Sequence, residues 1–321
     1  MALRILVTGG AGFIGGHLVR SLLDRGDEVA VVDNFDPFYP ERIKRRALEP
    51  LLARGARLFP IDIRDEAALQ ATFRASRPDA VVHLAALAGV RPSLVEPGRY
   101  IDVNVRGTAN VLAAARDAGV RRFVFGSSSS VYGARTQAPF RETDRTDSPL
   151  SPYAASKAAG ELLARTWHNL YGLEVVSLRF FTVYGPRQRP DLAIHKFARR
   201  MLAGQPLPFF GDGETRRDYT WFEDILAGVR AAIDRPGLSD EVVNLGGAAT
   251  TTLKDLIALL EEALGVKAIL DRQPMQAGDV PLTSADVSHG QTLLGYAPTT
   301  PIREGIKKFA EWMRGEGRDW V

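Results

Sequence analysis

The feature that most constrains this chain is a glycine-rich turn placed directly after its first apolar run. The run Arg4–Thr8 leads into Gly9-Gly10-Ala11-Gly12-Phe13-Ile14-Gly15, where a helical pattern begins. Spaced glycines permit a tight strand-to-helix turn, a close backbone approach to a pyrophosphate, and close packing of helix on strand. The helix N-terminus also offers unpaired N–H groups to phosphate. The pattern therefore predicts a dinucleotide site built on Gly9, Gly12 and Gly15.

A carboxylate in the expected place supports this interpretation. Asp33 ends the second apolar run, about twenty residues beyond the last glycine, where it can accept hydrogen bonds from the adenosine ribose. A carboxylate there repels a 2′-phosphate, and Asn34-Phe35 provide no arginine to receive one, so NAD is favoured over NADP. Other residues of these turns and strand ends are candidate cofactor contacts, although each could equally serve packing: Phe13, Ile14, Asn34, Asp62, Ile63, Leu84, Ala85, Ala86 and Ala88.

Short apolar runs alternate with segments of helical period, the pattern of βαβ units and a parallel sheet. The runs that predict strands are Arg4–Thr8, Glu28–Asp33, Ala56–Asp62, Ala80–Leu84, Arg122–Ser127, Glu174–Arg179 and Glu241–Leu245. The helical segments are Gly15–Asp24, Glu66–Ser76, Asn104–Ala118, Pro152–Tyr171, Leu253–Leu264 and Ile302–Arg314. We expect an α/β fold with a Rossmann-like, doubly wound parallel sheet over residues 1–180. A smaller, loop-rich C-terminal substrate lobe over 181–321 should return some segments to the first domain.

The bulk composition excludes several kinds of site. The 321 residues include no cysteine, which rules out disulfides, thiolate metal sites and cysteine nucleophiles. The net charge of +3 comes without long basic runs, so we expect no nucleic-acid partner. No stretch resembles a signal peptide or a membrane span, and the five histidines are scattered, so we expect a soluble cytoplasmic protein without a metal.

The segment Ser151-Pro152-Tyr153-Ala-Ala-Ser-Lys157 places a phenol and an amine four residues apart. If Pro152 opens a helix, both side chains share one face. A tyrosine normally titrates near 10; a neighbouring ammonium and a positive nicotinamide ring would lower its pKa and make it an acid/base. The spacing alone occurs by chance in many helices. The serine-rich strand end Ser127-Ser-Ser-Ser130 supplies hydroxyls that could bind the reacting oxygen.

Together these features resemble the extended short-chain dehydrogenases/reductases over nearly the whole chain. The resemblance continues in His83-Leu-Ala-Ala86, Asn104-Val-Arg-Gly-Thr108, Leu178–Pro186 and Gly211–Asp218. It implies a catalytic triad of Ser128, Tyr153 and Lys157, and a tightly held NAD that is recycled in each turnover. It also implies NAD contacts from Asn104 and Ser127, with Phe180 as a wall. Members commonly form homodimers, here through helices near Arg99–Ala118 and Pro152–Tyr171.

Within that family the chain is most similar to UDP-glucuronate 4-epimerases. The similarity is carried by Ala88–Ser93, Arg179–Asp191 and Pro274–Asp279. It implies that Thr182 and Arg189 meet the C6 carboxylate of the sugar, since a buried carboxylate requires paired donors and arginine binds it bidentately. The alternative is that Arg189 is a surface residue in a proline-rich loop. Further UDP-sugar contacts implied by the resemblance are Arg91, Ser129, Ser130, Phe197, Pro208, Phe210, Arg217 and Asp279.

The mechanism that these residues predict is 4-epimerisation through a 4-keto sugar. Tyr153 takes the C4 hydroxyl proton as hydride passes to NAD, and both return on the other face after the sugar turns. Alternatives on the same scaffold are UDP-glucose 4-epimerase, which usually has Asn at the position of Thr182, and a nucleotide-sugar decarboxylase. A dehydratase would need an Asp-Glu pair where this chain has Ser129-Ser130. A non-catalytic NAD-binding module would have no need for the complete triad.

Overall fold

The computed structural model describes residues 2–274, 280–318 and 320, and its centre is a parallel sheet in the order β11-β6-β5-β4-β1-β2-β3. Every neighbouring pair in this sheet is parallel, as the alternation of strands and helices predicted. Its strands are β1 (Arg4–Thr8), β2 (Glu28–Val32), β3 (Arg57–Phe59), β4 (Ala80–His83), β5 (Arg122–Ser128), β6 (Glu174–Phe180) and β11 (Asp240–Leu245). The expected doubly wound α/β fold is confirmed.

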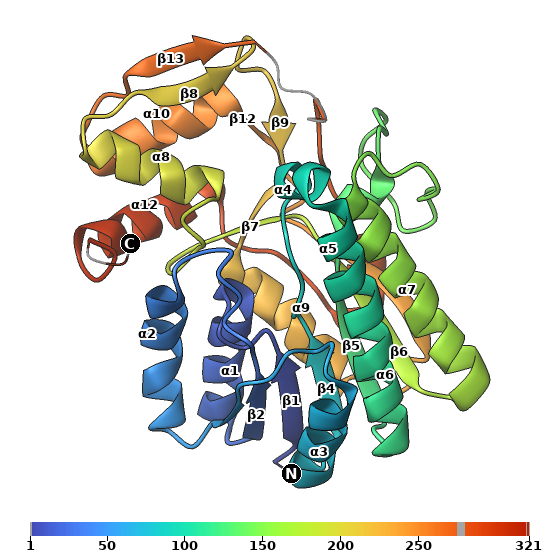
Figure 1. The fold of residues 1–321 in the computed structure, drawn as a ribbon. Coiled ribbons are helices and arrows are strands. Elements are labelled where there is room, and N and C mark those ends of the chain that lie inside the picture. The colour runs from blue at the N-terminus through green and yellow to red at the C-terminus, as the bar shows by residue number, and fades with distance from the viewer. Residues whose placement is uncertain (1, 275–279, 319, 321) are drawn as a thin grey trace.

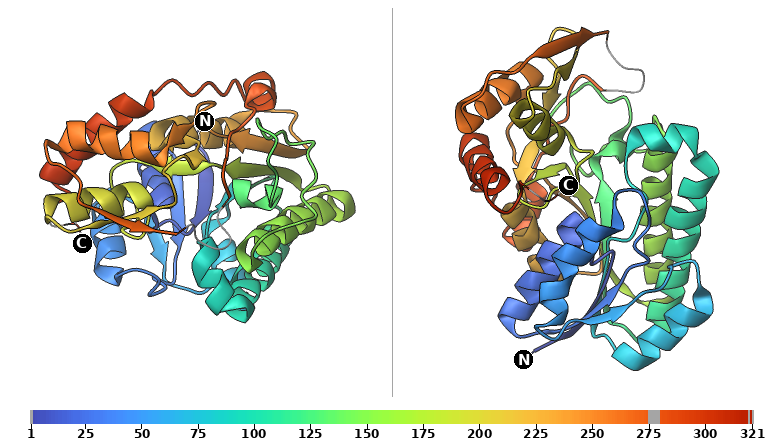
Figure 2. Two further views of the ribbon diagram at one scale, coloured as in Figure 1. Left: turned by 90° about the horizontal axis from the view of Figure 1, so that it is seen from above. Right: turned by 60° about the vertical axis from the view of Figure 1, so that its left-hand side comes forward.

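Helices cover both faces of the sheet because its strands are apolar on both sides. On one face lie α1 (Phe13–Arg25), α2 (Glu41–Leu52) and α9 (Phe222–Asp234), whose apolar side chains share one core with Val7, Val31 and Val124; α2 packs against α1. On the other face lie α3 (Glu66–Ser76), α6 (Gly107–Asp117) and α7 (Pro152–Tyr171), which pack against residues such as Leu6 and Phe123. Figure 2 shows the two helical layers with the sheet between them.

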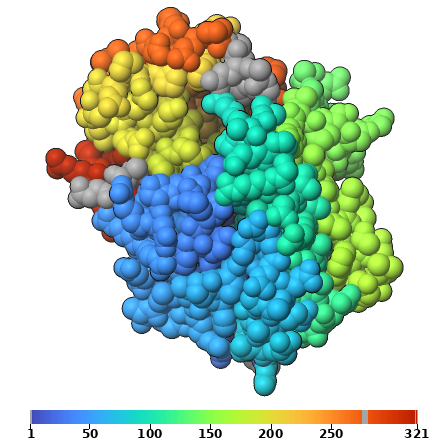
Figure 3. Space-filling view, viewed as in Figure 1, coloured from blue at the N-terminus to red at the C-terminus, as the bar shows by residue number. Residues whose placement is uncertain are grey.

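A smaller lobe stands over the carboxyl ends of the large sheet (Figures 1 and 3). Its apolar core, which includes Phe197, Phe209, Leu260 and Phe309, is separate from the two cores of the sheet. The elements of this lobe and the connections that lead to it are β7 (Thr182–Tyr184), α8 (Ala193–Leu202), β8 (Leu207–Phe210), β9 (Arg216–Arg217), β10 (Tyr219–Trp221), β12 (Thr251–Thr252), α10 (Leu253–Leu264), β13 (Leu270–Gln273) and α12 (Ile302–Arg314). The short helix α11 (Ser288–Leu294) instead returns to the large sheet, where it packs against α9 and β11.

Two predicted elements differ from the structure. The strand expected over Ala56–Asp62 pairs only at Arg57–Phe59, because Pro60 has no N–H to donate and the chain turns away after it. The helix expected over Asn104–Ala118 is irregular at its start. Here α4 (Val90–Val95) and α5 (Pro97–Ile101) lead into a π-helical turn at Asp102–Arg106 before α6 begins.

His17 ties α1 to the loop that follows β7. Its Nε2 lies 2.8 Å from the carbonyl oxygen of Pro186, and its ring centroid lies 4.1 Å from that of Phe222. Burial lowers the pKa of His17 to about 4, so the folded protein holds this side chain neutral. The unfolded chain takes up a proton below about pH 6.5, whereas the folded chain does so only near pH 4.

This difference predicts a pH-dependent loss of stability. The contribution of His17 is complete above about pH 6.5 and is lost as the pH falls to about 4, by on the order of 3 kcal/mol. The variant His17→Gln can still donate to Pro186 but cannot titrate, so its unfolding free energy should fall less steeply over this range. Urea unfolding of both proteins at several pH values measures this difference. If the unfolding free energies of the two proteins fall in parallel with pH, His17 is not the group responsible.

Candidate active site

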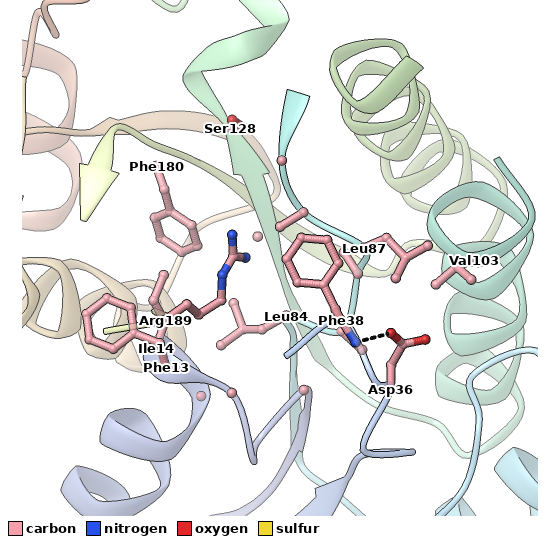
Figure 4. A pocket seen from close by; sticks show the side chains of 18 of the residues that line it. Phe13, Ile14, Asp36, Phe38, Leu84, Leu87, Val103, Ser128, Phe180 and Arg189 are labelled. Carbon is pink, nitrogen blue, oxygen red and sulfur yellow. Dashed lines mark hydrogen bonds between the residues drawn. The ribbon is translucent and has the colours of Figure 1, made fainter. Parts of the chain in front are cut away.

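A cavity of about 480 Å³ lies at the carboxyl ends of the central strands. The predicted residues that line it are Gly9, Gly12, Phe13, Ile14, Gly15, Asp33, Asn34, Asp62, Ile63, Leu84, Ala85, Ala86, Ala88, Ser127, Ser128, Ser129, Ser130, Tyr153, Lys157, Phe180, Thr182 and Arg189. They come from segments far apart in the sequence, and Figure 4 shows several of them around the cavity. Ligands of open α/β sheets bind in this position.

The glycine-rich turn forms one wall of the cavity. Gly9 has a φ of 71°, and a Cβ there would lie 2.7 Å from the backbone nitrogen of Ala85. A Cβ on Gly15 would overlap the carbonyl oxygen of Gly9. At Gly12, by contrast, a Cβ would meet only the carbonyl oxygen of Gly9, at 3.1 Å, among the described residues. The backbone at the start of α1 is therefore exposed to the cavity, and the turn fits a pyrophosphate.

Asp33 is fixed beside the glycine-rich turn. Its Oδ2 accepts a hydrogen bond from the backbone N–H of Ala11 at 3.0 Å, and its Oδ1 accepts one from Phe35 at 2.8 Å. Burial raises the pKa of Asp33, while the Phe35 N–H and the charge of Lys44 act against this rise. Lys44 also lines the cavity, and its Nζ donates to the carbonyl oxygen of Asp36 at 2.6 Å. Sequence reasoning missed Lys44, because nothing in its helical pattern distinguishes it from a surface lysine.

The helix that carries the predicted acid/base begins as its sequence indicates. Ser151 caps α7 by accepting a hydrogen bond from the N–H of Ala154 at 3.1 Å, and Pro152 occupies the first helical position. One turn apart, Tyr153 and Lys157 both line the cavity. Ser128 lies there too, at the end of β5, with its Oγ 3.1 Å from that of Ser130.

The electrostatic relation of these groups differs from the expected one. The ammonium of Lys157 donates to the carbonyl oxygen of Gly126 at 2.7 Å, and burial lowers the pKa of Lys157 to about 8. Burial raises the pKa of Tyr153, and the groups that oppose this rise are the hydroxyl of Ser128 and the charge of Arg189. The expectation that Lys157 lowers the pKa of Tyr153 is therefore not met within the polypeptide alone.

Behind the catalytic helix lies a buried chain of hydrogen bonds. Asn104, in the π-helical turn, accepts from the N–H of Leu87 at 2.8 Å and donates to the hydroxyl of Ser156 at 2.9 Å. That hydroxyl in turn donates to the carbonyl oxygen of Tyr153 at 2.7 Å. Asn104 is 2% exposed and does not line the cavity. The π-helical turn thus directs an amide towards α7, a role that the sequence did not reveal.

Arg189 reaches into the cavity from the loop after β7. Its guanidinium carbon lies 5.1 Å from the centroid of the Phe38 ring, and Figure 4 shows the group between Phe38 and Phe180. Its side chain is only 17% exposed and forms an ion pair with Asp191. The alternative interpretation of Arg189 as a surface residue is therefore wrong. Thr182, at the start of β7, lines the same cavity.

The remaining predicted substrate contacts that the structure describes, Arg91, Phe197, Pro208, Phe210 and Arg217, lie outside the lining of this cavity. Arg91, on α4, lies over the ring of Phe210 on β8, with 5.6 Å between guanidinium carbon and ring centroid. Pro208 is also on β8, and Arg217 is on β9. Phe197 is buried in the core of the smaller lobe. Asp279 lies outside the described residues.

Neither a membrane-spanning helix nor a cluster of metal ligands is found in the described part of the chain. Across residues 2–274, 280–318 and 320, no helix is both long and apolar enough to cross a bilayer. Within the same residues, no three His, Cys, Asp or Glu side chains are grouped so that they could hold a metal ion.

Comparison with known proteins adds independent information. The model of the NAD dependent epimerase/dehydratase family matches residues 5–246. A UDP-glucuronate 4-epimerase of Thermodesulfobacterium geofontis is 40% identical, with 96% of this chain and 95% of that protein covered. The chain is also similar to the crystal structure of UDP-glucuronic acid 4-epimerase from Bacillus cereus in complex with UDP-glucuronic acid and NAD. The TM-score is 0.91 and the sequence identity is 36%, with 97% of this chain and 98% of that one covered. The Thermotoga maritima UDP-glucose 4-epimerase with UDP-glucose has a TM-score of 0.89 and 35% identity, covering 97% and 99%.

Proposed function

The chain belongs to the NAD dependent epimerase/dehydratase family, and we propose that it interconverts UDP-glucuronate and UDP-galacturonate. It is an enzyme, an NAD-dependent UDP-sugar 4-epimerase, as its relatives and structural neighbours are. The choice of a uronate among UDP-sugars is supported by one observation above all. A guanidinium, that of Arg189, lies in the same cavity as Tyr153 and Ser128.

NAD is the cofactor, and it supplies an acceptor and donor of hydride when bound. We assign its pyrophosphate to the backbone around Gly12 and its adenosine ribose to Asp33, where the carboxylate is already oriented by two backbone donors. Lys157, fixed on Gly126, is assigned to the nicotinamide ribose. Asn104 acts from behind the cavity wall, so we assign it to the support of α7 rather than to direct contact.

Tyr153 moves the proton of the C4 hydroxyl. The phenol oxygen accepts this proton when C4 is oxidised and returns it when C4 is reduced, while Ser128 donates a hydrogen bond to the C4 oxygen. Because burial raises the pKa of Tyr153, the phenolate requires nearby positive charge. Arg189 already contributes such charge, and a bound cationic nicotinamide would act in the same direction.

Thr182 and Arg189 are assigned to the C6 carboxylate. Oxidation at C4 of a uronate creates a β-keto acid, which loses carbon dioxide when the C5–C6 bond aligns with the carbonyl π system. An epimerase has to hold the carboxylate away from that alignment. A guanidinium can do so through paired hydrogen bonds of fixed direction, with the Thr182 hydroxyl as a further donor.

The smaller lobe is assigned to the UDP moiety. We therefore assign residues 1–180 mainly to the binding of NAD and residues 181–321 mainly to the binding of the UDP-sugar. Strand β11 belongs to the second range but returns to the large sheet. Arg91 and Phe210 are in contact across the space between α4 and β8, which suits a site shared by both parts of the chain. The UDP-sugar contacts proposed outside the cavity are Arg91, Phe197, Pro208, Phe210 and Arg217. Asp279, which is outside the described residues, stays a proposed contact.

A homodimer is proposed on the apolar surface of α7 and the neighbouring α5. Leu162 and Leu170 are each 65% exposed and lie eight residues apart on α7, hence on nearly one face. Ile101, at the end of α5, is also exposed, and α5 contacts α7. Exposed apolar residues grouped in this way favour a protein partner, and a second copy can cover them symmetrically. A cytoplasmic location stays a prediction.

The reaction can be tested by following product formation in NMR spectra. With UDP-glucuronate, the wild-type protein should form UDP-galacturonate without added NAD, since the cofactor is retained and recycled. Tyr153→Phe should lower turnover by about 100- to 10,000-fold, the usual range for an acid/base, while nucleotide binding persists. Turnover of UDP-glucose but not of UDP-glucuronate would identify the chain as a UDP-glucose 4-epimerase.

The carboxylate site is tested by Arg189→Ala. Because Arg189 also favours the phenolate of Tyr153, the variant should lower kcat/KM for both sugars; loss of the charged hydrogen bond should lower it by about a further 10- to 100-fold for UDP-glucuronate alone. Steady-state kinetics with both substrates provide the comparison. An equal loss with both sugars would argue against a contact between Arg189 and the C6 carboxylate.

The dimer is tested by placing charges on its proposed interface. The double variant Leu162→Glu, Leu170→Glu should sediment as a monomer, because two carboxylates would be buried without partners. Leu202→Glu is the matched control, since Leu202 is an exposed leucine of α8 in the smaller lobe. A wild-type protein that sediments as a monomer would refute the proposal.

A further inference from the structure

The guanidinium of Arg189 is held by a carboxylate of its own loop. Its Nε donates to Oδ1 of Asp191 at 3.0 Å, and its Nη2 donates to Oδ2 at 2.8 Å. The two groups therefore form a bidentate, side-on pair, a geometry that restricts the rotation of the guanidinium plane. The Arg189 side chain is 17% exposed, against 40% for that of Asp191, so the carboxylate lies on the solvent side of the pair.

The local sequence explains why this pair forms. The N–H of Leu192 donates to the carbonyl oxygen of Arg189 at 3.2 Å, which closes a four-residue turn. Pro190 is the second residue of that turn, a position that proline favours because its φ is fixed. The turn brings Asp191 back beside the side chain of Arg189.

The chain before this turn is also fixed. His195 is buried, and its Nδ1 lies 2.6 Å from the carbonyl oxygen of Gln188. The Gln188 side chain is buried as well and donates to the carbonyl oxygen of Val183 at 3.1 Å. These contacts fix the backbone before Arg189, so what can still vary is the orientation of the Arg189 side chain. The hydrogen bonds to Asp191 restrict that orientation.

The pair with Asp191 uses only some of the N–H groups of the Arg189 guanidinium. A guanidinium has five N–H groups, and the pair with Asp191 uses the one on Nε and one on Nη2. The two on Nη1 and the second on Nη2 remain. One N–H of Nη1 and the second N–H of Nη2 form the end-on edge of the group, whereas the other N–H of Nη1 points back towards Cδ. This edge can bind a second carboxylate bidentately while Asp191 stays in place. The ring of Phe38, 5.1 Å away, packs against the guanidinium and limits its tilt.

We propose that Asp191 is a specificity-determining residue that positions the end-on edge of Arg189 for the C6 carboxylate of the UDP-sugar. This inference rests on the proposed function. Asp191 lies outside the cavity lining and acts through Arg189, so it is a positioning residue. A sugar without a carboxylate forms no bidentate pair with that edge, so its binding does not depend on how the edge is oriented.

Loss of this orientation has a defined chemical consequence. In the 4-keto uronate, a freely turning carboxylate lets the C5–C6 bond align with the C4 carbonyl. That bond then breaks, its electron pair enters the C4–C5 enolate, and carbon dioxide leaves. C5 takes a proton from water, which gives a UDP-4-keto-pentose, and the hydride taken from C4 stays on the cofactor. The share of the 4-keto uronate that loses carbon dioxide therefore tests the proposal. A purely structural role of Asp191 would not change this share.

The test uses Asp191→Ala and Asp191→Asn in the full-length, NAD-loaded protein, with Asp191→Glu as the conservative rescue. We expect kcat/KM for UDP-glucuronate to fall by about 10-fold in the first two variants, as for a lost hydrogen bond to a charged group. Binding of UDP-glucose should stay within about twofold of wild type, since the pair does not touch a neutral sugar. The ratio of UDP-4-keto-pentose to epimer, measured by NMR, should rise, and Asp191→Glu should restore part of both properties.

The chain contains a matched control. Arg145 and Asp147 form an ion pair with the same spacing, in an exposed segment that does not line the cavity. Asp147→Asn should leave kinetics, binding and product ratio unchanged. Equal losses with both sugars, or no change in the product ratio, would refute the role of Asp191. Tighter UDP-glucuronate binding in Asp191→Ala would show that Asp191 competes with the substrate, which also refutes it.

The two hypotheses fail in different ways. A wild-type protein that neither epimerises UDP-glucuronate nor binds it better than UDP-glucose refutes the proposed substrate, and the role of Asp191 falls with it. A wild-type protein that epimerises UDP-glucuronate, together with Asp191 variants that keep its selectivity, refutes the role of Asp191 alone.

Discussion

The active site depends on how closely α7 packs against β5. A Cβ on Gly160 would overlap the ring of Phe125, so only glycine allows this approach. One turn earlier Lys157 donates to the carbonyl oxygen of Gly126, and one residue later Glu161 accepts from the hydroxyl of Ser127. Because these contacts fix the helix along its length, its first turn is delivered to the end of β5, where Ser128 lies.

A buried ion pair reinforces this arrangement. Glu161 accepts two hydrogen bonds from Arg179 of β6, at 2.9 and 2.8 Å, and both side chains are almost inaccessible to water. An isolated charge at this depth would cost several kcal/mol, but the bidentate geometry and the hydroxyl of Ser127 satisfy the carboxylate. The pair connects α7 to β6. It contributes more to fixing the position of the helix than to the net free energy of folding, since the cost of burying two charges offsets much of their attraction.

The features that the sequence could predict are those set by local rules. The glycine turn, the strands and the start of α7 at Ser151-Pro152 follow from periodicity, steric limits and capping, which act over a few residues. The sequence did not reveal the π-helical turn at Asp102–Arg106 or the contact between Lys157 and Gly126. These depend on partners 31 to 52 residues away, whose approach is decided only when the sheet forms. Lys44 was missed for another reason: its partner Asp36 is only eight residues away, but the helical pattern around Lys44 is that of a surface lysine.

The groups for chemistry and the group for selectivity line one cavity but come from different elements of the fold. The acid/base and its hydroxyl partner are on α7 and β5, whose backbone is fixed by the sheet and by buried polar contacts. The guanidinium is on a turn, and its direction depends on one half-exposed ion pair. Burial opposes charge on both Tyr153 and Lys157, so the positive charge of Arg189 also bears on the ionisation of the phenol. A group that selects the substrate thus influences the acid/base, because both line the same cavity. A change in the turn can alter which sugar is accepted while the scaffold stays intact, but it cannot leave the proton transfer wholly untouched.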